Sequence, residues 1–162
     1  VPFQDDPYLK QLTLAGYVYK GSNMSAVSTA LQRDRFGILL GYGYSYATVG
    51  VEYNVRKDAP ANPDTVIGGN ALSFFGEVKA PFEEWKNTFA FVWRYDIVEP
   101  NVEKGGDVTR FAILGLAFKP HEKVTFVLNS QWTKGETESL KRNDGTKTNY
   151  DGRWFLHTIV NF

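Results

Sequence analysis

Along almost the whole chain every second residue is apolar and the residues between are polar or small, and the spacing of an amphipathic helix is hard to find. In residues 48–56 the odd positions hold Val, Val, Tyr and Val, while the even positions hold Thr, Gly, Glu, Asn and Arg. Successive side chains of a β-strand point to opposite faces, so this period produces one apolar and one polar face. The pattern predicts an all-β, antiparallel fold.

Eight segments carry this alternation, and turn-forming or polar stretches separate them. The length of 162 residues suits one domain, which we take to span 1–162. Ile113 and Leu114 are adjacent apolar residues, so we expect a β-bulge between them. The expected strands lie near residues 9–20, 35–46, 48–56, 71–80, 88–97, 109–119, 124–132 and 154–162.

The connections between these segments differ in length. Those after the first, third, fifth and seventh segments are long and polar, and the other three are short. Strict alternation of long and short connections is typical of an up-and-down transmembrane β-barrel with long outer loops and short periplasmic turns. On this layout both ends of the sequence fall on the periplasmic side. The long connections are 21–34, 57–70, 99–107 and 134–152, and the short ones lie near 47, 81–84 and 120–123.

Aromatic residues make up 15% of the chain, and they fall near the ends of the expected strands. Trp and Tyr favour the two interfaces of a bilayer, so we expect these residues to mark both edges of a membrane. Tyr44, Tyr46, Phe118 and Trp85 fall on the periplasmic side. The candidates for interface aromatics are Tyr44, Tyr46, Trp93, Tyr95, Trp132 and Trp154.

Composition excludes several classes of protein. The 18 basic and 18 acidic residues cancel, so nothing indicates a nucleic-acid partner, and the absence of Cys removes disulfides and thiolate sites. No apolar run approaches the ~18 residues of a transmembrane helix. A mean hydropathy of −0.33 is compatible with barrel strands, which are apolar only at alternate positions. Residues 1–6 show no signal peptide, which we expect to have been removed or cut away.

A soluble barrel has the same period with its apolar face inside, so a lipocalin-like carrier of apolar ligands is an alternative. Three features count against that alternative: the unequal connections, the paired aromatic groups, and a last strand that stays apolar up to Phe162. The Gly-x-Trp motif that opens lipocalins is also missing near the first strand. We keep the soluble carrier as the third hypothesis.

Four groups of segments stand in a defined order along the chain: 9–17, 34–36 leading to 49–53, 91–96 followed by 99–101, and 109–111 through 115–120. They resemble the C-terminal half of a larger Gram-negative outer-membrane porin, and the closing Phe162 resembles the C-terminal signal of such barrels. The resemblance implies a bacterial outer-membrane location, contact with outer-membrane lipid and lipopolysaccharide, and recognition of the last strand by the barrel assembly machinery. It also implies a passive diffusion channel for small hydrophilic solutes or ions, and it leaves homo-oligomers open.

The number of strands decides between two forms of this hypothesis. Side chains nearly fill an eight-stranded barrel, whereas about sixteen strands enclose an aqueous channel. A complete eight-stranded barrel would have a structural or adhesive role, while the C-terminal half of a wider barrel would form part of a pore. Charged residues of the polar faces would pair across a narrow barrel or line a wide one. These lumen-lining candidates are Arg35, Glu52, Arg56, Glu77, Lys79, Arg94 and Asp96.

We expect no enzymatic activity, because His121 and His157 are the only histidines and neither has the partners of a catalytic triad. We also expect no cofactor and no metal. The acidic, glycine-bearing stretches 143–145 and 149–152 lack the ligand spacing of an EF-hand and are better explained as turns.

Overall fold

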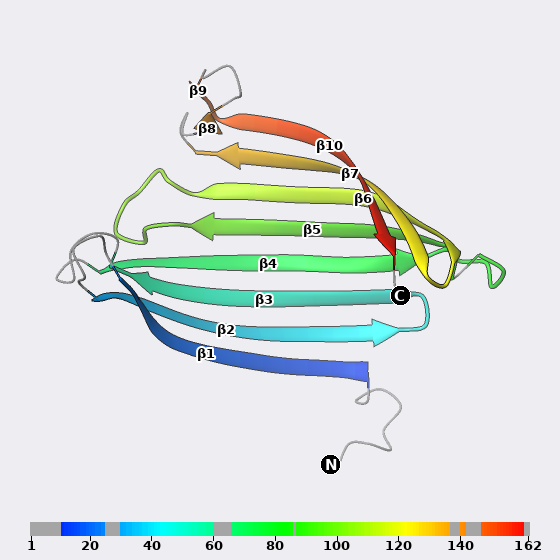
Figure 1. The fold of residues 1–162 in the computed structure, drawn as a ribbon, viewed down its shortest axis with the longest axis horizontal. Coiled ribbons are helices and arrows are strands. Elements are labelled where there is room, and N and C mark those ends of the chain that lie inside the picture. The colour runs from blue at the N-terminus through cyan, green and yellow to red at the C-terminus, as the bar shows by residue number, and fades with distance from the viewer. Residues whose placement is uncertain are drawn as a thin grey trace, which may run out of the picture.

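The structure is a computed structural model that describes residues 11–24, 30–59, 66–85, 87–136, 140–141 and 147–160. Eight strands form one antiparallel sheet in which each strand pairs with the next along the chain. The prediction of an all-β, up-and-down antiparallel fold is confirmed (Figure 1). The strands are β1 (Leu12–Met24), β2 (Ala30–Tyr44), β3 (Ala47–Asp58), β4 (Ile67–Lys79), β5 (Phe89–Glu99), β6 (Thr109–His121), β7 (Val124–Gly135) and β10 (Tyr150–Val160), and a separate two-stranded sheet joins β8 (Leu140–Lys141) to β9 (Lys147–Thr148).

The register keeps apolar side chains on one face across the whole sheet. Leu14, Leu40 and Val51 are register partners in β1 to β3, and the same face continues through Leu116 and Leu128 to Leu156 in β10. The side chains of paired residues in an antiparallel ladder point to the same face of the sheet. The apolar residues of each strand therefore lie beside those of its neighbours across all eight strands. The sheet therefore has one mainly apolar face and one face that carries most of the charged residues.

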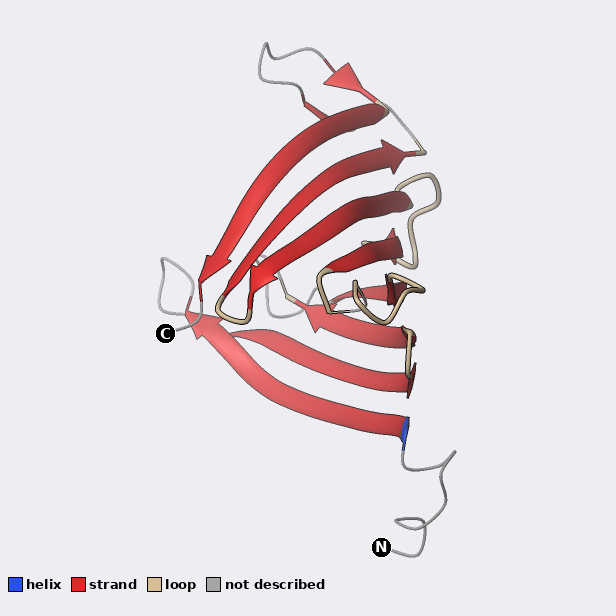
Figure 2. Ribbon diagram, turned by 90° about the vertical axis from the view of Figure 1, so that its right-hand side faces the viewer, coloured by secondary structure: helices blue, strands red, loops and turns tan. Residues whose placement is uncertain are grey.

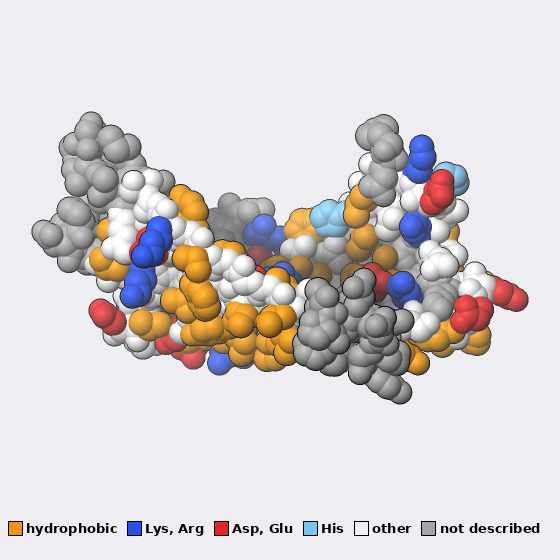
Figure 3. Space-filling view, turned by 90° about the horizontal axis from the view of Figure 1, so that it is seen from below, with side chains coloured by type: hydrophobic (Ala, Val, Ile, Leu, Met, Phe, Trp, Pro, Cys, Tyr) orange, Lys and Arg blue, Asp and Glu red, His pale blue; other side chains and the backbone are white. Residues whose placement is uncertain are grey.

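The sheet is strongly curved. Strands β1 and β10 bend toward the same side of the molecule (Figure 2). Figure 3 shows Lys, Arg, Asp and Glu side chains in the hollow of this curve and hydrophobic side chains along its outer side. We call these the concave face and the convex face. The two-residue turns at 45–46 and 122–123 lie at one end of the strands, which we call the turn end. The opposite end of the strands is the loop end.

Burial is the reverse of that in a soluble globular domain. Among the described hydrophobic residues only Ala59 is buried, whereas Ser73, Asp96 and Asn129 are buried on the concave face. Apolar side chains on the convex face are open, and Leu156 is 70% exposed. Soluble proteins rarely expose a continuous apolar surface of this size without a partner for it. No helix among the described residues has the length and apolarity needed to cross a membrane.

The sheet is not closed. Within the described residues, β1 pairs only with β2 and β10 pairs only with β7, so each keeps one free edge. The sequence left two forms open, and the structure does not show the first of them, a complete eight-stranded barrel. Each strand of the sheet is antiparallel to the next, so the first of the eight strands, β1, and the last, β10, run in opposite directions. A further antiparallel strand could pair with the free edge of either one.

The expected strict alternation of long and short connections is wrong. Residues 80–88, between β4 and β5, form a connection as long as residues 100–108, between β5 and β6. The amide of Trp85 bonds to the carbonyl of Phe82 at 3.0 Å, and the amides of Thr88 and Phe89 bond to the carbonyl of Trp85. These bonds form turns in the described residues 80–85 and 87–88, so the length of this connection does not make it an open loop. At the loop end β1 and β2 extend further than expected, so the connection between them is shorter than the predicted 21–34.

The β-bulge lies elsewhere than expected. Residues 109–118 of β6 pair without interruption with β7, and the register shifts between Phe118 and His121. Leu114 takes a place on the convex face, and Ile113 lies on the concave face opposite Arg94 and Gln131. The concave face accepts an apolar residue there, so no extra residue is needed at this point.

Candidate functional site

All seven lumen-lining candidates lie on the concave face. The register pairs Glu52 with Ser73 and Ser73 with Asp96, which places these residues in one row across β3, β4 and β5. Arg35 and Arg56 are partners in a row nearer the loop end. Glu77 and Lys79 lie on the same face as Arg94, because odd-numbered residues of β4 pair with even-numbered residues of β5. The structure thus gathers charges of both signs on one curved surface, although whether that surface lines a lumen stays a prediction.

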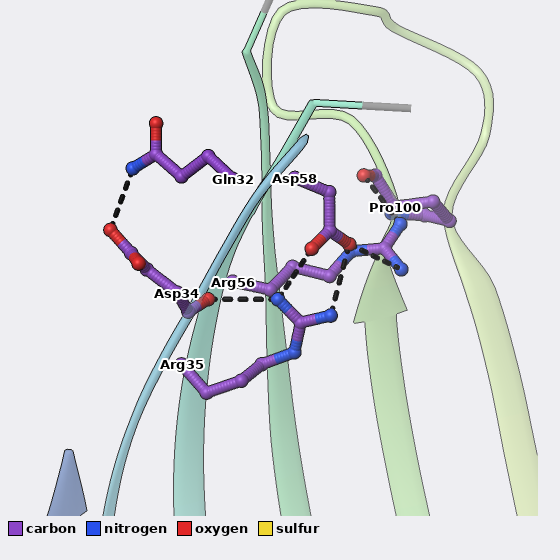
Figure 4. A network of polar contacts seen from close by, with 6 residues as sticks. All are labelled: Gln32, Asp34, Arg35, Arg56, Asp58 and Pro100. Atoms are coloured by element: carbon purple, nitrogen blue, oxygen red, sulfur yellow. Dashed lines mark hydrogen bonds and ion pairs between the residues drawn. The ribbon is translucent and has the colours of Figure 1, made fainter. Parts of the chain in front are cut away.

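At the loop end, Asp58 holds two arginines that would otherwise repel each other. Arg35 Nη1 and Nη2 donate to Asp58 Oδ1 at 2.6 Å and Oδ2 at 3.1 Å, and Arg56 Nη1 lies 3.9 Å from Asp58 Oδ2 (Figure 4). Arg35 and Arg56 are direct cross-strand partners, an arrangement of like charges that is unfavourable by itself. The bidentate carboxylate offsets that repulsion and fixes the guanidinium of Arg35.

Arg56 also reaches across β4 to the connection that follows β5. Its Nη2 donates to the carbonyl oxygen of Pro100 at 2.9 Å (Figure 4). Between them lies Gly69, where an added Cβ would be 2.7 Å from the Pro100 oxygen and 2.8 Å from Arg56 Nε. The missing side chain of Gly69 therefore makes the space in which Arg56 crosses the strand. The amide of Val102 donates to the Gly68 carbonyl at 2.9 Å and ties the same connection to β4.

A third arginine, Arg94, is fixed in the middle of the concave face. Arg94 Nε lies 2.9 Å from both carboxylate oxygens of Asp96, and Nη2 is 3.2 Å from Ser73 Oγ. Asp96 and Ser73 are buried, so the pair is partly withdrawn from water. The guanidinium carbon also lies 5.9 Å from the centre of the Phe75 ring. These contacts hold Arg94 in one direction along the sheet.

Two shallow hollows lie along the concave face beside Glu77. One, of about 470 Å³, is lined by Phe75, Val92, Ile113, Glu77 and Arg94 among others. The other, of about 300 Å³, lies toward the turn end and includes Glu77, Lys79 and Lys119. In the described part of the chain, Glu52, Glu77 and Lys79 take part in no salt bridge. Their charges are available to water or to a solute.

The convex face has a defined apolar band. Among the described strand residues, charges on this face occur only near the loop end. Below them the face is mainly apolar down to the turn end, for example from Ala112 to Phe118 and from Phe89 to Ile97. The band thus spans six to eight residue steps, about 20–26 Å along a strand. The charged residues at its border are Lys20, Asp34, Lys57, Glu99, Arg110 and Lys134.

Five of the predicted interface aromatics, Tyr44, Trp93, Tyr95, Trp132 and Trp154, share the convex face with this band. Tyr44 lies at the turn end as expected, and Trp154 is 73% exposed. Trp93, Tyr95 and Trp154 lie nearer the middle of their strands than expected, because β5 and β10 extend further at the loop end. Whether these residues meet a membrane interface stays a prediction.

Tyr46 lies in the turn between β2 and β3, and its hydroxyl donates a hydrogen bond to Glu83 in the connection after β4. This bond, with partial desolvation and the negative charge of Glu83, raises the pKa of the Tyr46 phenol above its usual 10.0. Tyr46 thus joins two connections at the turn end. Sequence reasoning placed it correctly near this end but could not identify its partner.

A chain of aromatic rings runs along the turn end of the convex side. Ring centres are 6.3 Å apart between Phe82 and Trp85, 5.8 Å between Trp85 and Phe89, 5.0 Å between Phe89 and Phe118, and 6.5 Å between Phe118 and Phe126. The sequence indicated Trp85 and Phe118 individually. It could not show that the folded connection 80–88 adds two rings to those of three strands.

Asp58 and Ser73 were not among the predicted site residues. Extending the alternation of the third strand by two residues beyond Arg56 would have placed Asp58 on the same face, at the i, i+2 spacing that Arg94 and Asp96 also have. Ser73 gave no comparable signal, since its role depends on the cross-strand partner. Phe162 and residues 143–145 lie outside the described residues.

Each of the two histidines makes a local contact within the described residues. His121 Nδ1 accepts a hydrogen bond from the amide of Lys123 in the β6–β7 turn, and His157 stacks on Phe155 with ring centres 5.8 Å apart. Residues 149–152 form the start of β10 and the position before it. No three His, Cys, Asp or Glu side chains are grouped to hold a metal in the part of the chain that the structure describes.

Comparison with known proteins adds no relative. No protein-family model, no curated protein sequence and no solved structure matches this chain.

Proposed function

We propose that this protein is a porin-type channel of a bacterial outer membrane, through which small hydrophilic solutes or ions diffuse passively. The observation that carries the proposal is the reversed sheet: an exposed apolar band on the convex face and charged side chains on the concave face. A bilayer is the environment in which the first face is stable, and water is the one in which the second is stable.

The dimensions of the sheet support a transmembrane position. Its strands contain 11 to 15 residues, and a tilted transmembrane strand needs about 9–11. The apolar band of about 20–26 Å is comparable with the ~25 Å band of outer-membrane barrels. A border of charged residues at the loop end would lie at the outer membrane surface. Leu116, in the middle of the band and 63% exposed, would contact lipid tails.

The concave face supports an aqueous lumen. Glu52, Glu77 and Lys79 carry charges that form no salt bridge among the described residues. An unpaired charge is costly in a dry interior, so these groups favour a water-filled space over a lumen plugged by side chains. The fixed Arg35–Asp58 and Arg94–Asp96 pairs would form parts of the same wall.

The free edges of β1 and β10 support a barrel wider than eight strands. Unpaired backbone groups cannot remain in a bilayer, so both edges need partner strands. Strands of the same polypeptide or of a further copy would complete the wall, and about sixteen strands leave room for an aqueous channel. The apolar, lipid-facing last strand would be the part that the barrel assembly machinery recognises, and lipopolysaccharide would surround the loop end.

The proposal is tested by single-channel recording in planar lipid bilayers with protein folded from detergent. We expect discrete current steps proportional to voltage, which are absent with detergent alone. Glu52→Lys should shift the zero-current potential in a KCl gradient toward that of an anion-preferring pore, whereas Leu128→Ala on the convex face should leave it unchanged. Folded protein that inserts into lipid vesicles but carries no current would contradict a channel. A closed structural or adhesive barrel would give that result, whereas a soluble carrier would stay dissolved without detergent.

A further inference from the structure

Two tyrosines lie in succession on the concave face of β1, toward the loop end. Tyr17 and Tyr19 are 48% and 52% exposed. They are register partners of Gly37 and Arg35 in β2, and through these they align with Asn54 and Arg56 in β3. Aromatic rings are thus exposed on the polar face, beside charged groups that are already fixed. Neither the fold nor the proposed channel explains that placement.

Each ring covers a glycine. A Cβ added at Gly37 would collide with the Tyr17 ring, and one added at Gly21 would collide with the Tyr19 ring. The rings therefore lie in the space that a side chain at each glycine would need, and about half of the surface of each tyrosine stays exposed. The hydroxyl of Tyr17 donates to Asn54 Oδ1 at 2.8 Å, which fixes the ring across β2. The two glycines and this bond hold the rings as a preformed aromatic surface.

The polar groups around the rings are suited to hydrogen bonding with a neutral ligand. Asp58 compensates Arg35 and also lies near Arg56, so the charges at this end partly cancel. The Asn54 side-chain amide, the Asp58 carboxylate and the guanidinium groups still offer donors and acceptors beyond the bonds that they make here. Planar polar groups therefore border two exposed tyrosine rings.

We propose that Tyr17 and Tyr19, with Asn54, Arg35 and Asp58, form a binding surface for neutral oligosaccharides. A sugar ring has an apolar face of C–H groups, which stacks on aromatic rings, and an edge of hydroxyls, which bonds to carboxylates, amides and guanidinium groups. The assignment of this surface to the path of a solute rests on the proposed channel function. Binding of the sugar itself requires only the concave face.

The test measures binding of maltopentaose and of cellopentaose to detergent-folded protein by isothermal titration calorimetry. We expect at least one of these sugars to bind, and the double variant Tyr17→Ser, Tyr19→Ser to bind about tenfold more weakly because both stacking faces are lost. Tyr17→Phe keeps the ring and should retain most of the affinity. Tyr44→Ser, at an exposed tyrosine of the convex face, is the matched control and should bind like the unaltered protein.

The outcomes separate this inference from the proposed function. Channel currents without binding of either sugar would overturn the inference and leave the channel standing. Sugar binding that depends on Tyr17 and Tyr19, in a protein that carries no current, would support the surface and contradict the channel. An equal loss of affinity in Tyr44→Ser would show nonspecific contact and overturn the assignment. Circular dichroism of every variant establishes that the sheet has formed before binding is compared.

Discussion

Glycines of the concave face decide where its long side chains can cross from strand to strand. Gly37 lies beneath the ring of Tyr17, which reaches from β1 to Asn54 of β3. Gly69 lies beneath the side chain of Arg56, which reaches from β3 to Pro100 after β5. In both cases a long polar side chain spans the strand next to its own and bonds beyond it. A long side chain that crosses a glycine of the neighbouring strand thus connects more distant parts of the concave face at two places.

Gly69→Ala should lower the free energy of unfolding by about 1–3 kcal/mol, because a methyl group in a filled space forces its neighbours to move. The added Cβ would meet backbone oxygens of Pro100 and Glu99 at 2.7 and 2.9 Å. Gly41→Ala is the matched control, since its nearest neighbour would be Thr13 Cβ at an ordinary 3.6 Å. That change should alter stability by less than about 1 kcal/mol. Urea unfolding in lipid vesicles measures both, and equal effects would contradict the crossing of Arg56 over Gly69.

Tyr46 should give stability a component that is lost at high pH. Its hydrogen bond to Glu83 raises the pKa of the phenol in the folded protein above the unfolded value of 10.0. The folded state therefore binds this proton more tightly, so the contribution is complete below pH 10 and declines as the pH rises through the raised pKa. Thermal unfolding from pH 8 to 11 should show a difference between the unaltered protein and Tyr46→Phe that shrinks above about pH 10. A difference that does not change with pH would contradict this bond.

The two faces of each strand meet different surroundings, and neighbouring residues of one element reveal it. Leu116 and Ala117 follow each other in β6, the first on the convex face and the second on the concave face. Leu116→Arg should destabilise the protein in lipid vesicles by about 2–4 kcal/mol, as expected for a charge near the middle of a bilayer. Ala117→Arg should cost clearly less, because the concave face already carries charged residues. Urea unfolding at fixed lipid composition measures the free energy of unfolding of both variants. A larger loss of stability for Ala117→Arg than for Leu116→Arg would contradict the assignment of the convex face to lipid.

The strands were predictable from sequence to the extent that their alternation was regular. The parity of β3 follows from its four odd apolar residues, and the register confirms it. The loop ends of β1 and β2 were missed because polar residues and glycine interrupt the pattern there, although backbone pairing continues to Met24 and Ala30. Pairing depends on the neighbouring strand, which a single segment does not reveal. The bulge before His121 was missed for the same reason.

The candidate site divides in a similar way. Period-two alternation was enough to place Arg35, Glu52 and Arg94 on one face. The bonds among them could not be predicted, because the partner of Arg56 across Gly69 depends on the register of three strands and on a connection. Likewise, Ser73 gains a role only because β5 brings Arg94 beside it. The sequence pattern predicts on which face of the sheet a residue lies. Its contacts depend on the register between strands, which the pattern does not reveal.

At the scale of the whole molecule, the chain forms a curved wall with an apolar outside and a charged inside. Its described residues contain almost no buried apolar side chain, so packing within the sheet cannot by itself account for stability. The free edges of β1 and β10 leave the wall open on two sides. A bilayer against the convex face and partner strands at both edges would supply what the isolated sheet lacks.

The contact of the convex face with lipid can be measured directly, because the chain contains no native Cys that would compete for a label. Single cysteines are introduced one at a time at residues 125–128 of β7, spin-labelled, and examined in lipid vesicles by electron paramagnetic resonance. Oxygen concentrates in lipid, and a charged nickel chelate stays in water. We predict that labels at Phe126 and Leu128 are more accessible to oxygen, and those at Thr125 and Val127 to the nickel chelate. Alternation of the opposite phase, or equal accessibility at all four positions, would contradict a sheet that faces lipid on its convex side and water on its concave side.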